Sequence, residues 1–223
     1  MKEKAINLRP EYSAQRRSHP PNPALFHAIE VIQTLRGSKR LGKVADLGCG
    51  KLRHFDLLIR LADELFLIDT QNQLSANHED LGKSYTVLQI AEKARKRGRK
   101  VQAVATDAFA KTKLSLDVIF CVAVFDVVPR HTRRSLIESA AGNLAKHGVF
   151  VVIAPRNDST ILRRCHPDNA YADGYVFRNR GAHTFFHNFK NYEDIIKDCR
   201  KVGLSLIKDL SRYRQVCLLF RSN

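Results

Sequence analysis

A regular alternation of short apolar runs with segments of helical periodicity constrains the fold of this sequence most strongly. The apolar runs that predict strands are "KVADLG", "ELFLID", "KVQAVATD", "LDVIFCVAVFDVV" and "VFVVIAP". Between them stand "LRHFDLLIRLAD", "SYTVLQIAEKARKRG" and "HTRRSLIESAAGNLAKHG", which predict helices. Strands that alternate with helices pair in parallel through right-handed crossovers. The sequence therefore predicts an α/β fold of three layers around a doubly wound, mostly parallel sheet.

The end of the sequence departs from this alternation. "LSLIKDL" and "VCLLFRS" predict two strands that are separated only by the turn-like "SRYRQ". A parallel crossover needs a dozen or more residues, so two strands joined this closely must run antiparallel. We therefore expect a seven-stranded sheet that ends in an antiparallel hairpin.

The length of 223 residues and the hydrophobic fraction of 44% suit one sizeable domain. Residues 1–21 are polar, basic and without apolar periodicity, which predicts a loosely held N-terminal arm that could cover a site. Residues 22–223 then form a single domain, whose first helix begins at Asn22 and ends at Gly37. Within it, residues 156–190 show no clear period and predict an insert, because loops of this length usually carry function or are disordered.

The charge predicts anionic partners. Lysine and arginine number 38 against 22 acidic residues, a net charge of +16, which should attract nucleic acid, anionic metabolites or acidic lipid surfaces. The densest cluster is "EKARKRGRK", with six basic residues between Lys93 and Lys100. The sequence has no apolar run of about 20 residues, no signal peptide and no C-x-x-C pair among its five cysteines. We expect a cytoplasmic protein with no membrane partner.

The stretch "KVADLGCGKLRHF" predicts a strand, a glycine turn and a helix. Gly48 and Gly50 stand where the backbone must adopt a positive φ or approach a ligand closely. A dinucleotide fingerprint needs a third glycine at the position of Arg53, so a nicotinamide-dependent dehydrogenase is disfavoured. A tight turn without a ligand and a site for another nucleoside cofactor both stay open on this motif alone.

Two aspartates favour the nucleoside cofactor. Asp69 ends the second predicted strand, where a carboxylate can accept hydrogen bonds from both ribose hydroxyls of an adenosine. Asp107 follows the third strand, where it could accept a hydrogen bond from a purine amine. Either residue alone could be a solvated loop residue or a helix cap. Together with the glycine turn, they place candidate adenosine contacts after three successive strands, at the edge where open α/β sheets bind ligands.

These motifs resemble those of the class I S-adenosylmethionine-dependent methyltransferases, over about residues 24–221. "VADLGCG", "LFLIDT" and "AVATDAF" are similar to the first three motifs of that family, and "LDVIFCVAVFDVVP" and "LAKHGVFVVIAP" to the segments of strands four and five. The terminal hairpin resembles the reversed seventh strand of the family. The resemblance implies the family's seven-stranded fold, a methyltransferase activity and S-adenosylmethionine as cofactor. The sequence departs from the family pattern at Leu52, which replaces the third glycine of G-x-G-x-G.

The resemblance also implies which residues contact the cofactor. Residues 46 and 48–50 would wrap its methionine part, Asp69 would bind the ribose, Asp107 and Ala108 would line the adenine, and residues 121 and 122 would lie beneath the sulfonium. Arg53 could pair with the cofactor carboxylate or be a solvated cation. The implied cofactor-binding residues are Asp46, Gly48, Cys49, Gly50, Asp69, Thr70, Asp107, Ala108, Cys121 and Val122.

The residues that act on the acceptor are harder to predict, because methyl transfer depends largely on positioning and a general base is optional. The candidate catalytic residues are Asp126, His131, His183 and His187. His183 and His187 could also form a metal couple, but no third ligand is evident, so we expect no metal site. A structural or surface role is the alternative for each histidine.

These patterns predict an S-adenosylmethionine-dependent methyltransferase with a small or medium-sized acceptor, which the positive charge allows to be anionic. The charge also supports an alternative, an RNA or DNA methyltransferase. The sequence lacks the N/D-P-P-Y/F/W tetrapeptide that amino-group base methylases carry after strand four, and Cys121 does not follow a proline as in 5-methylcytosine enzymes. A second alternative is a methyltransferase-like protein that binds nucleic acid or a partner protein without catalysis.

Overall fold

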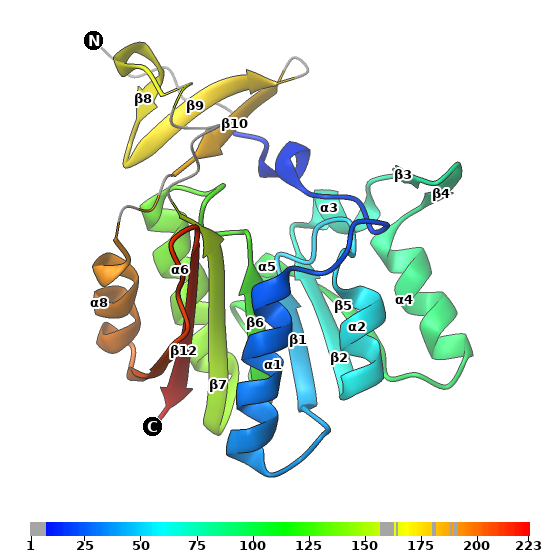
Figure 1. Ribbon diagram of the computed structural model, residues 1–223. Coiled ribbons are helices and arrows are strands. Elements are labelled where there is room, and N and C mark those ends of the chain that lie inside the picture. Colours follow the sequence, from blue (N-terminus) through cyan, green and yellow to red (C-terminus); the bar gives the residue numbers. More distant parts are fainter. Residues whose placement is uncertain (1–7, 157–162, 164, 180–181, 188, 190) are drawn as a thin grey trace.

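The centre of the protein is a seven-stranded sheet with the strand order β11-β12-β7-β6-β1-β2-β5 (Figure 1). The computed structural model describes residues 8–156, 163, 165–179, 182–187, 189 and 191–223. In sheet order the strands are β11 (Leu204–Asp209), β12 (Gln215–Ser222), β7 (Leu144–Pro155), β6 (Leu116–Val122), β1 (Gly42–Leu47), β2 (Ala62–Asp69) and β5 (Val101–Ala105). The strands from β7 to β5 pair in parallel, whereas β12 is antiparallel to both β7 and β11. The predicted mostly parallel sheet with an antiparallel terminal hairpin is thus confirmed.

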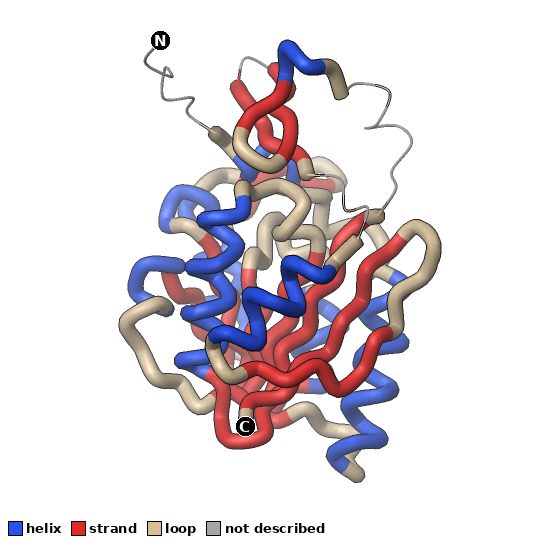
Figure 2. The backbone as a smooth tube through the Cα atoms, turned by 90° about the vertical axis from the view of Figure 1, so that its left-hand side faces the viewer, coloured by secondary structure: helices blue, strands red, loops and turns tan. Residues whose placement is uncertain are grey.

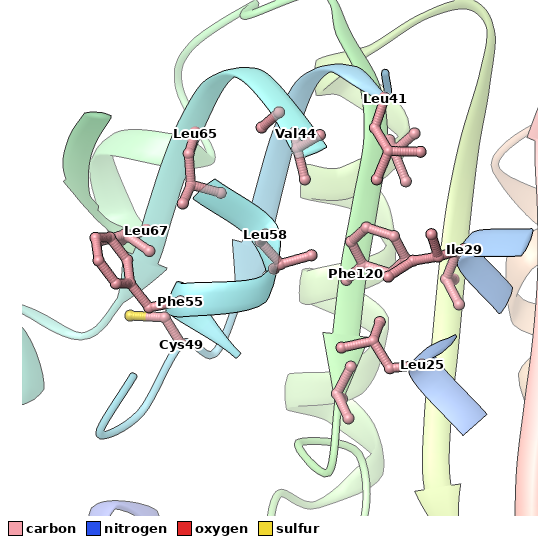
Figure 3. Packing of buried hydrophobic residues seen from close by; sticks show 14 of the residues in the cluster. Leu25, Ile29, Leu41, Val44, Cys49, Phe55, Leu58, Leu65, Leu67 and Phe120 are labelled. Atoms are coloured by element: carbon pink, nitrogen blue, oxygen red, sulfur yellow. The ribbon is translucent and has the colours of Figure 1, made fainter. Parts of the chain in front are cut away.

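Helices cover both faces of this sheet. They are α1 (Pro23–Arg36), α2 (Phe55–Leu61), α3 (Gln71–Ser75), α4 (Val87–Lys96), α5 (Thr106–Phe109), α6 (Arg130–Asn143) and α8 (Glu193–Lys201). Neighbouring residues of β1 point to opposite faces. Val44 belongs to a hydrophobic cluster with residues of α1, α2 and α4, and Figure 3 shows those of α1 and α2 around it. Ala45 belongs to a second cluster, with residues of α5, α6 and α8. The two hydrophobic clusters make the three layers that the sequence predicted.

The first helix has the ends that its sequence predicts. The Asn22 side chain accepts a hydrogen bond from the backbone N–H of Ala24 at 3.0 Å. Gly37 ends the helix in the left-handed conformation, with φ of 61°. Among the described residues, no helix is both apolar enough and long enough to cross a membrane.

Several predicted boundaries differ from those in the structure, and two differ most. The strand expected over residues 116–128 ends at Val122, because Ala123 adopts a positive φ of 55°. The helix expected to end at Gly148 ends at Asn143, and residues 144–148 already belong to β7. The buried Asn143 side chain fixes this turn, since it donates to the carbonyl oxygen of Phe109 at 2.8 Å and accepts from the N–H of Leu114 at 3.0 Å. Apolar periodicity does not reveal such a side-chain contact.

Short strands occupy two segments in which the sequence pattern showed no regular element. The polar loop after Asp69 holds the hairpin of β3 (His78–Asp80) and β4 (Lys83–Tyr85). The insert contains η2 (Pro167–Asn169) and an antiparallel sheet of β8 (Ala170–Tyr171), β9 (Gly174–Asn179) and β10 (Ala182–Phe186). This small sheet lies beyond the carboxyl ends of the parallel strands (Figures 1 and 2).

The described part of the N-terminal arm contacts both the insert and the main domain. It contains η1 (Pro10–Ser13). The N–H of Arg9 donates to the carbonyl oxygen of His183 at 2.8 Å. Farther along, Arg17 pairs with Asp56 at 2.6 Å. The arm therefore crosses the same edge of the main sheet that the insert covers.

Candidate functional site

A cavity of about 550 Å³ opens at the carboxyl ends of the parallel strands. The main domain lines it with the turn after β1, the ends of β2 and β6, the loop after β6 and the start of β12. The arm and Phe186 of the insert line the rest. Its lining includes Pro10, Ala14, Asn22, Gly48, Cys49, Gly50, His54, Asp69, Thr70, Gln73, Thr106, Val122, Val124, Asp126, Val128, Leu136, Phe186, Arg214 and Gln215. Segments from most of the chain length thus meet at this edge, where open α/β sheets bind ligands.

The glycine turn forms one wall of the cavity, and its backbone conformation explains its residues. Gly48 and Gly50 have φ values of 78° and 53°. A Cβ atom at Gly48 would lie 2.3 Å from Cγ2 of Val124, so any larger residue there would displace the Val124 side chain. Leu52 also has a positive φ, of 64°, while its side chain is fully buried. Leu52 therefore adopts the backbone conformation that favours glycine and fills the core beneath the turn.

Asp69 ties this turn to the end of β2. One carboxylate oxygen, Oδ2, accepts a hydrogen bond from the N–H of Gly50 at 2.8 Å, and Oδ1 accepts one from the N–H of Thr70 at 2.8 Å. The Thr70 hydroxyl caps α3 by accepting from the N–H of Gln73 at 3.2 Å. The negative charge of Asp69 is therefore held on the cavity wall by backbone contacts on both sides.

Two buried polar side chains beside the turn have atoms without a hydrogen-bond partner among the described residues. Asp46, the last but one residue of β1, is 1% exposed, and neither of its carboxylate oxygens has a partner. Burial, and then the charge of Asp69, raise the pKa of Asp46 to about 7. Nε2 of His54 is likewise unpartnered, and burial, with the charge of Arg53, lowers the pKa of His54 to about 4. Unpaired buried polar atoms are costly, so they suggest that a polar ligand completes this site.

The loop after β6 brings Asp126 to the cavity and is held by the insert. The N–H of His187 donates to the carbonyl oxygen of Asp126 at 2.7 Å. The buried guanidinium of Arg133 donates to the carbonyl oxygens of Phe125 and Val128, both at 3.0 Å, and pairs with Asp173 between β8 and β9. The insert therefore fixes the shape of the loop that carries Asp126.

The predicted site residues fall into two groups. Those that line the cavity are Gly48, Cys49, Gly50, Asp69, Thr70, Val122 and Asp126. Asp46 and Cys121 are buried within their strands, and Asp107 and Ala108 are exposed on α5 beside the lining residue Thr106. The three candidate histidines lie outside the lining: His131 is exposed on α6, His183 is exposed on β10, and His187 packs against Phe189 with its ring centroid 4.4 Å away. The roles of all these residues stay predictions.

The lining also contains residues that sequence reasoning missed. His54 and Gln73 come from the segments after β1 and β2, and Asn22, Arg214 and Gln215 come from opposite ends of the chain. His54 follows the glycine turn directly, which was a usable signal. The amide of Gln215 donates to Oδ1 of Asn22 at 2.8 Å across 193 residues, and no local pattern could reveal that contact. Within the described part of the chain, no three His, Cys, Asp or Glu side chains form a group that could hold a metal ion.

Comparison with known proteins decides the class of fold. The 1,6-didemethyltoxoflavin-N1-methyltransferase of Burkholderia thailandensis, solved with S-adenosylhomocysteine, matches with a TM-score of 0.60 over 91% of this chain and 80% of its own, at 12% identity. This chain has the class I S-adenosylmethionine-dependent methyltransferase fold. The magnesium protoporphyrin IX methyltransferase of Synechocystis shows the same fold, with a TM-score of 0.56, 14% identity and coverage of 90% of this chain and 82% of its own.

Sequence comparison identifies no relative of known function among the matches described here. No protein-family model matches the chain. The uncharacterized protein YmfD of Escherichia coli is 23% identical over 207 residues, which are 93% of this chain and 89% of that protein. The class I methyltransferase fold is therefore established by structural similarity, and the fit of S-adenosylmethionine rests on the cavity itself.

Proposed function

We propose that this protein is an S-adenosylmethionine-dependent methyltransferase that acts on a small or medium-sized acceptor. The observation that carries the proposal is the grouping, at one cavity in a class I methyltransferase fold, of the glycine turn, the carboxylate of Asp69 and the unpartnered Nε2 of His54. The buried, unpartnered carboxylate of Asp46 lies in β1 directly before this turn. When bound, the cofactor supplies an electrophilic methyl group on a sulfonium.

The residues of the turn and of β2 suit the polar parts of this cofactor. Each oxygen of Asp69 can accept more than one hydrogen bond, so the carboxylate can bind ribose hydroxyls while it holds Gly50. Asp46 offers a buried carboxylate to the ammonium of the methionine part, and the neutral His54 offers a second polar atom. Gly48 and Gly50 let the backbone approach the ligand closely.

We propose the remaining cofactor contacts on the resemblance to the family. Val122, with Cys121 behind it, forms the floor beneath the sulfonium at the end of β6. Thr106 lines the cavity where α5 begins, and the exposed Asp107 and Ala108 follow it. A hydrogen bond from an adenine amine would give Asp107 a partner at that end of the cavity.

The rest of the cavity suits an acceptor. Val128, Leu136 and Phe186 contribute apolar side chains to its lining, and Arg214 and Gln215 contribute polar ones. The volume of about 550 Å³ falls within the roughly 300–1,000 Å³ that small-molecule sites occupy. Among the candidate bases, Asp126 alone lines the cavity as described, so we assign to its carboxylate any proton that an acceptor hydroxyl or amine must lose.

A nucleic-acid acceptor is the second candidate, because the net charge of +16 favours polyanions. Incubation with methyl-labelled S-adenosylmethionine and fractionated cell extract separates the two. We expect label in the small-molecule fraction, and less of it when Asp69→Ala replaces the wild type at a cofactor concentration that does not saturate the variant. Label in RNA or DNA would contradict the small acceptor, and no label in any fraction would contradict methyl transfer itself.

A further inference from the structure

Exposed cations that outnumber the acids around them gather at the edge of the main sheet opposite the cavity. The last turns of α4 and its connection to β5 contain Lys93, Arg95, Lys96, Arg97, Arg99 and Lys100, all of them exposed. Lys96 pairs with Glu92 at 2.8 Å. The other five side chains form no hydrogen bond or ion pair with any residue that the structure describes.

The same edge carries further cations, because the segments that lead into the parallel strands end there. Exposed lysines flank the starts of β1, β6 and β7 at Lys39, Lys43, Lys111, Lys113 and Lys146. We call these five lysines, together with the basic residues of 93–100 other than Lys96, the basic edge.

Nearby acidic side chains offset only part of the charge of the basic edge, because arginines outside it already pair with two of them. Asp63 pairs with Arg40 at 2.8 Å, and Asp117 pairs with Arg36 at 2.9 Å. Glu64 accepts a hydrogen bond of 2.8 Å from the neutral amide of Gln102, so it keeps its charge and offsets part of that of the neighbouring Arg95 and Arg99. The net positive charge of the protein is therefore concentrated in part on this edge, away from the cavity.

Helix stability explains only part of this cluster. Cations in the last turn of a helix interact favourably with its dipole, which accounts for Lys93, Arg95 and Lys96. Arg97, Arg99 and Lys100 follow the helix end, where that effect falls off. Like charges this close repel one another, so a partner that supplies negative charge would stabilise the arrangement.

The shape of the basic edge fits a linear polyanion. From β5 to β7 it follows five neighbouring strands, which at about 4.8 Å per step span roughly 19 Å. A nucleic-acid duplex presents one negative charge about every 1.7 Å of its axis, so several phosphates lie within that span. Residues 93–100 include no aromatic residue on which a base could stack, so the contact is with phosphates.

We propose that the basic edge binds the phosphate backbone of nucleic acid without sequence preference. The strands run from this edge to the cavity, and their lengths give the distance between the two. β5 has five residues and β2 has eight, which corresponds to about 16–26 Å. A nucleic acid held at the basic edge is therefore a docking partner and not the methyl acceptor. This inference does not depend on the proposed activity.

Fluorescence anisotropy with labelled 20-base-pair DNA and RNA duplexes tests the proposal. If the protein contacts five phosphates, its affinity for either duplex should fall several hundred-fold between about 50 and 200 mM salt. The triple variant Arg95→Glu, Arg97→Glu, Arg99→Glu should bind at least tenfold more weakly, with a salt slope reduced by about 3. The matched control is Arg178→Glu, Lys208→Glu, Arg212→Glu, which makes the same charge change outside the basic edge, in β9, in β11 and in the turn before β12, and should lose much less affinity.

Three results would overturn the proposal. They are no binding of either duplex at 50 mM salt, an equal loss of affinity in both triple variants, and binding only to vesicles that contain phosphatidylserine. Circular dichroism and the affinity for S-adenosylhomocysteine should stay unchanged in both triple variants, which shows that each is folded. A failure of wild-type protein to bind S-adenosylhomocysteine would bear on the proposed function alone.

Discussion

The backbone N–H of Gly50 donates a hydrogen bond of 2.8 Å to Oδ2 of Asp69 across 19 residues of sequence. The contact joins the carboxyl ends of the neighbouring strands β1 and β2. The position of the charge at Asp69 and the path of the glycine turn therefore depend on each other. Changes in the turn should alter ligand binding as well as stability.

Gly48→Ala should destabilise the protein more than Gly37→Ala. Both glycines have a positive φ, which costs an alanine about 1–2 kcal/mol. Only at Gly48 would the new Cβ meet another atom, Cγ2 of Val124 at 2.3 Å, which adds about 1–3 kcal/mol of overpacking. Urea unfolding of both variants measures the difference. Equal losses in the free energy of unfolding would contradict the described turn.

At Leu52, substitution by glycine should destabilise the protein less than substitution by alanine. Leu52→Ala loses buried contacts worth about 2–5 kcal/mol and keeps the positive φ, whereas Leu52→Gly loses the contacts and relieves the backbone. We therefore expect the glycine variant to be the more stable by about 1 kcal/mol. Leu58, equally buried within α2, is the control and should show the reverse order, because glycine costs a helix about 1 kcal/mol relative to alanine. The same order at both positions would argue against the left-handed conformation of Leu52.

The sequence was sufficient for the sheet, its terminal hairpin and the end of α1, because these follow from apolar periodicity and from glycine and proline positions. It was insufficient where a side chain overrides the pattern, as Asn143 does at the end of α6. About half of the cavity lining could be predicted from the sequence, because motif residues such as Gly48 and Asp69 directly follow or end their strands. Walls such as Asn22 and Gln215 come from distant segments, so tertiary packing alone reveals them.

The pKa of Asp46 predicts proton-coupled ligand binding. In the free protein this pKa is raised to about 7, so the group is largely protonated below that pH. A bound ammonium favours the carboxylate, so binding should release a proton, and the affinity for S-adenosylhomocysteine should rise between about pH 5 and 7 by up to tenfold per pH unit. Calorimetry at pH 6 in buffers of different ionisation enthalpy measures the release.

Asp46→Asn should bind more weakly and lose this pH dependence. The same raised pKa means that the folded protein keeps a proton that the unfolded chain releases above about pH 4. In the absence of ligand, this group should therefore lower the free energy of unfolding as the pH rises from about 4 to about 7, and the variant should lack that contribution. An affinity of the wild type that is the same at pH 5.5 and pH 7.5 would show that Asp46 does not face the ammonium.

Titration calorimetry with S-adenosylhomocysteine tests the cofactor site most directly. The control variant is Asp63→Ala, which removes a carboxylate paired with Arg40 at the opposite edge of the sheet. The wild type and this control should each bind one molecule per chain with the same affinity. Asp69→Ala should bind at least about tenfold more weakly, since hydrogen bonds to a charged group contribute about 1.5–3 kcal/mol. No binding by the wild type, or equal affinity of wild type and Asp69→Ala, would contradict the assignment of this cavity to S-adenosylmethionine.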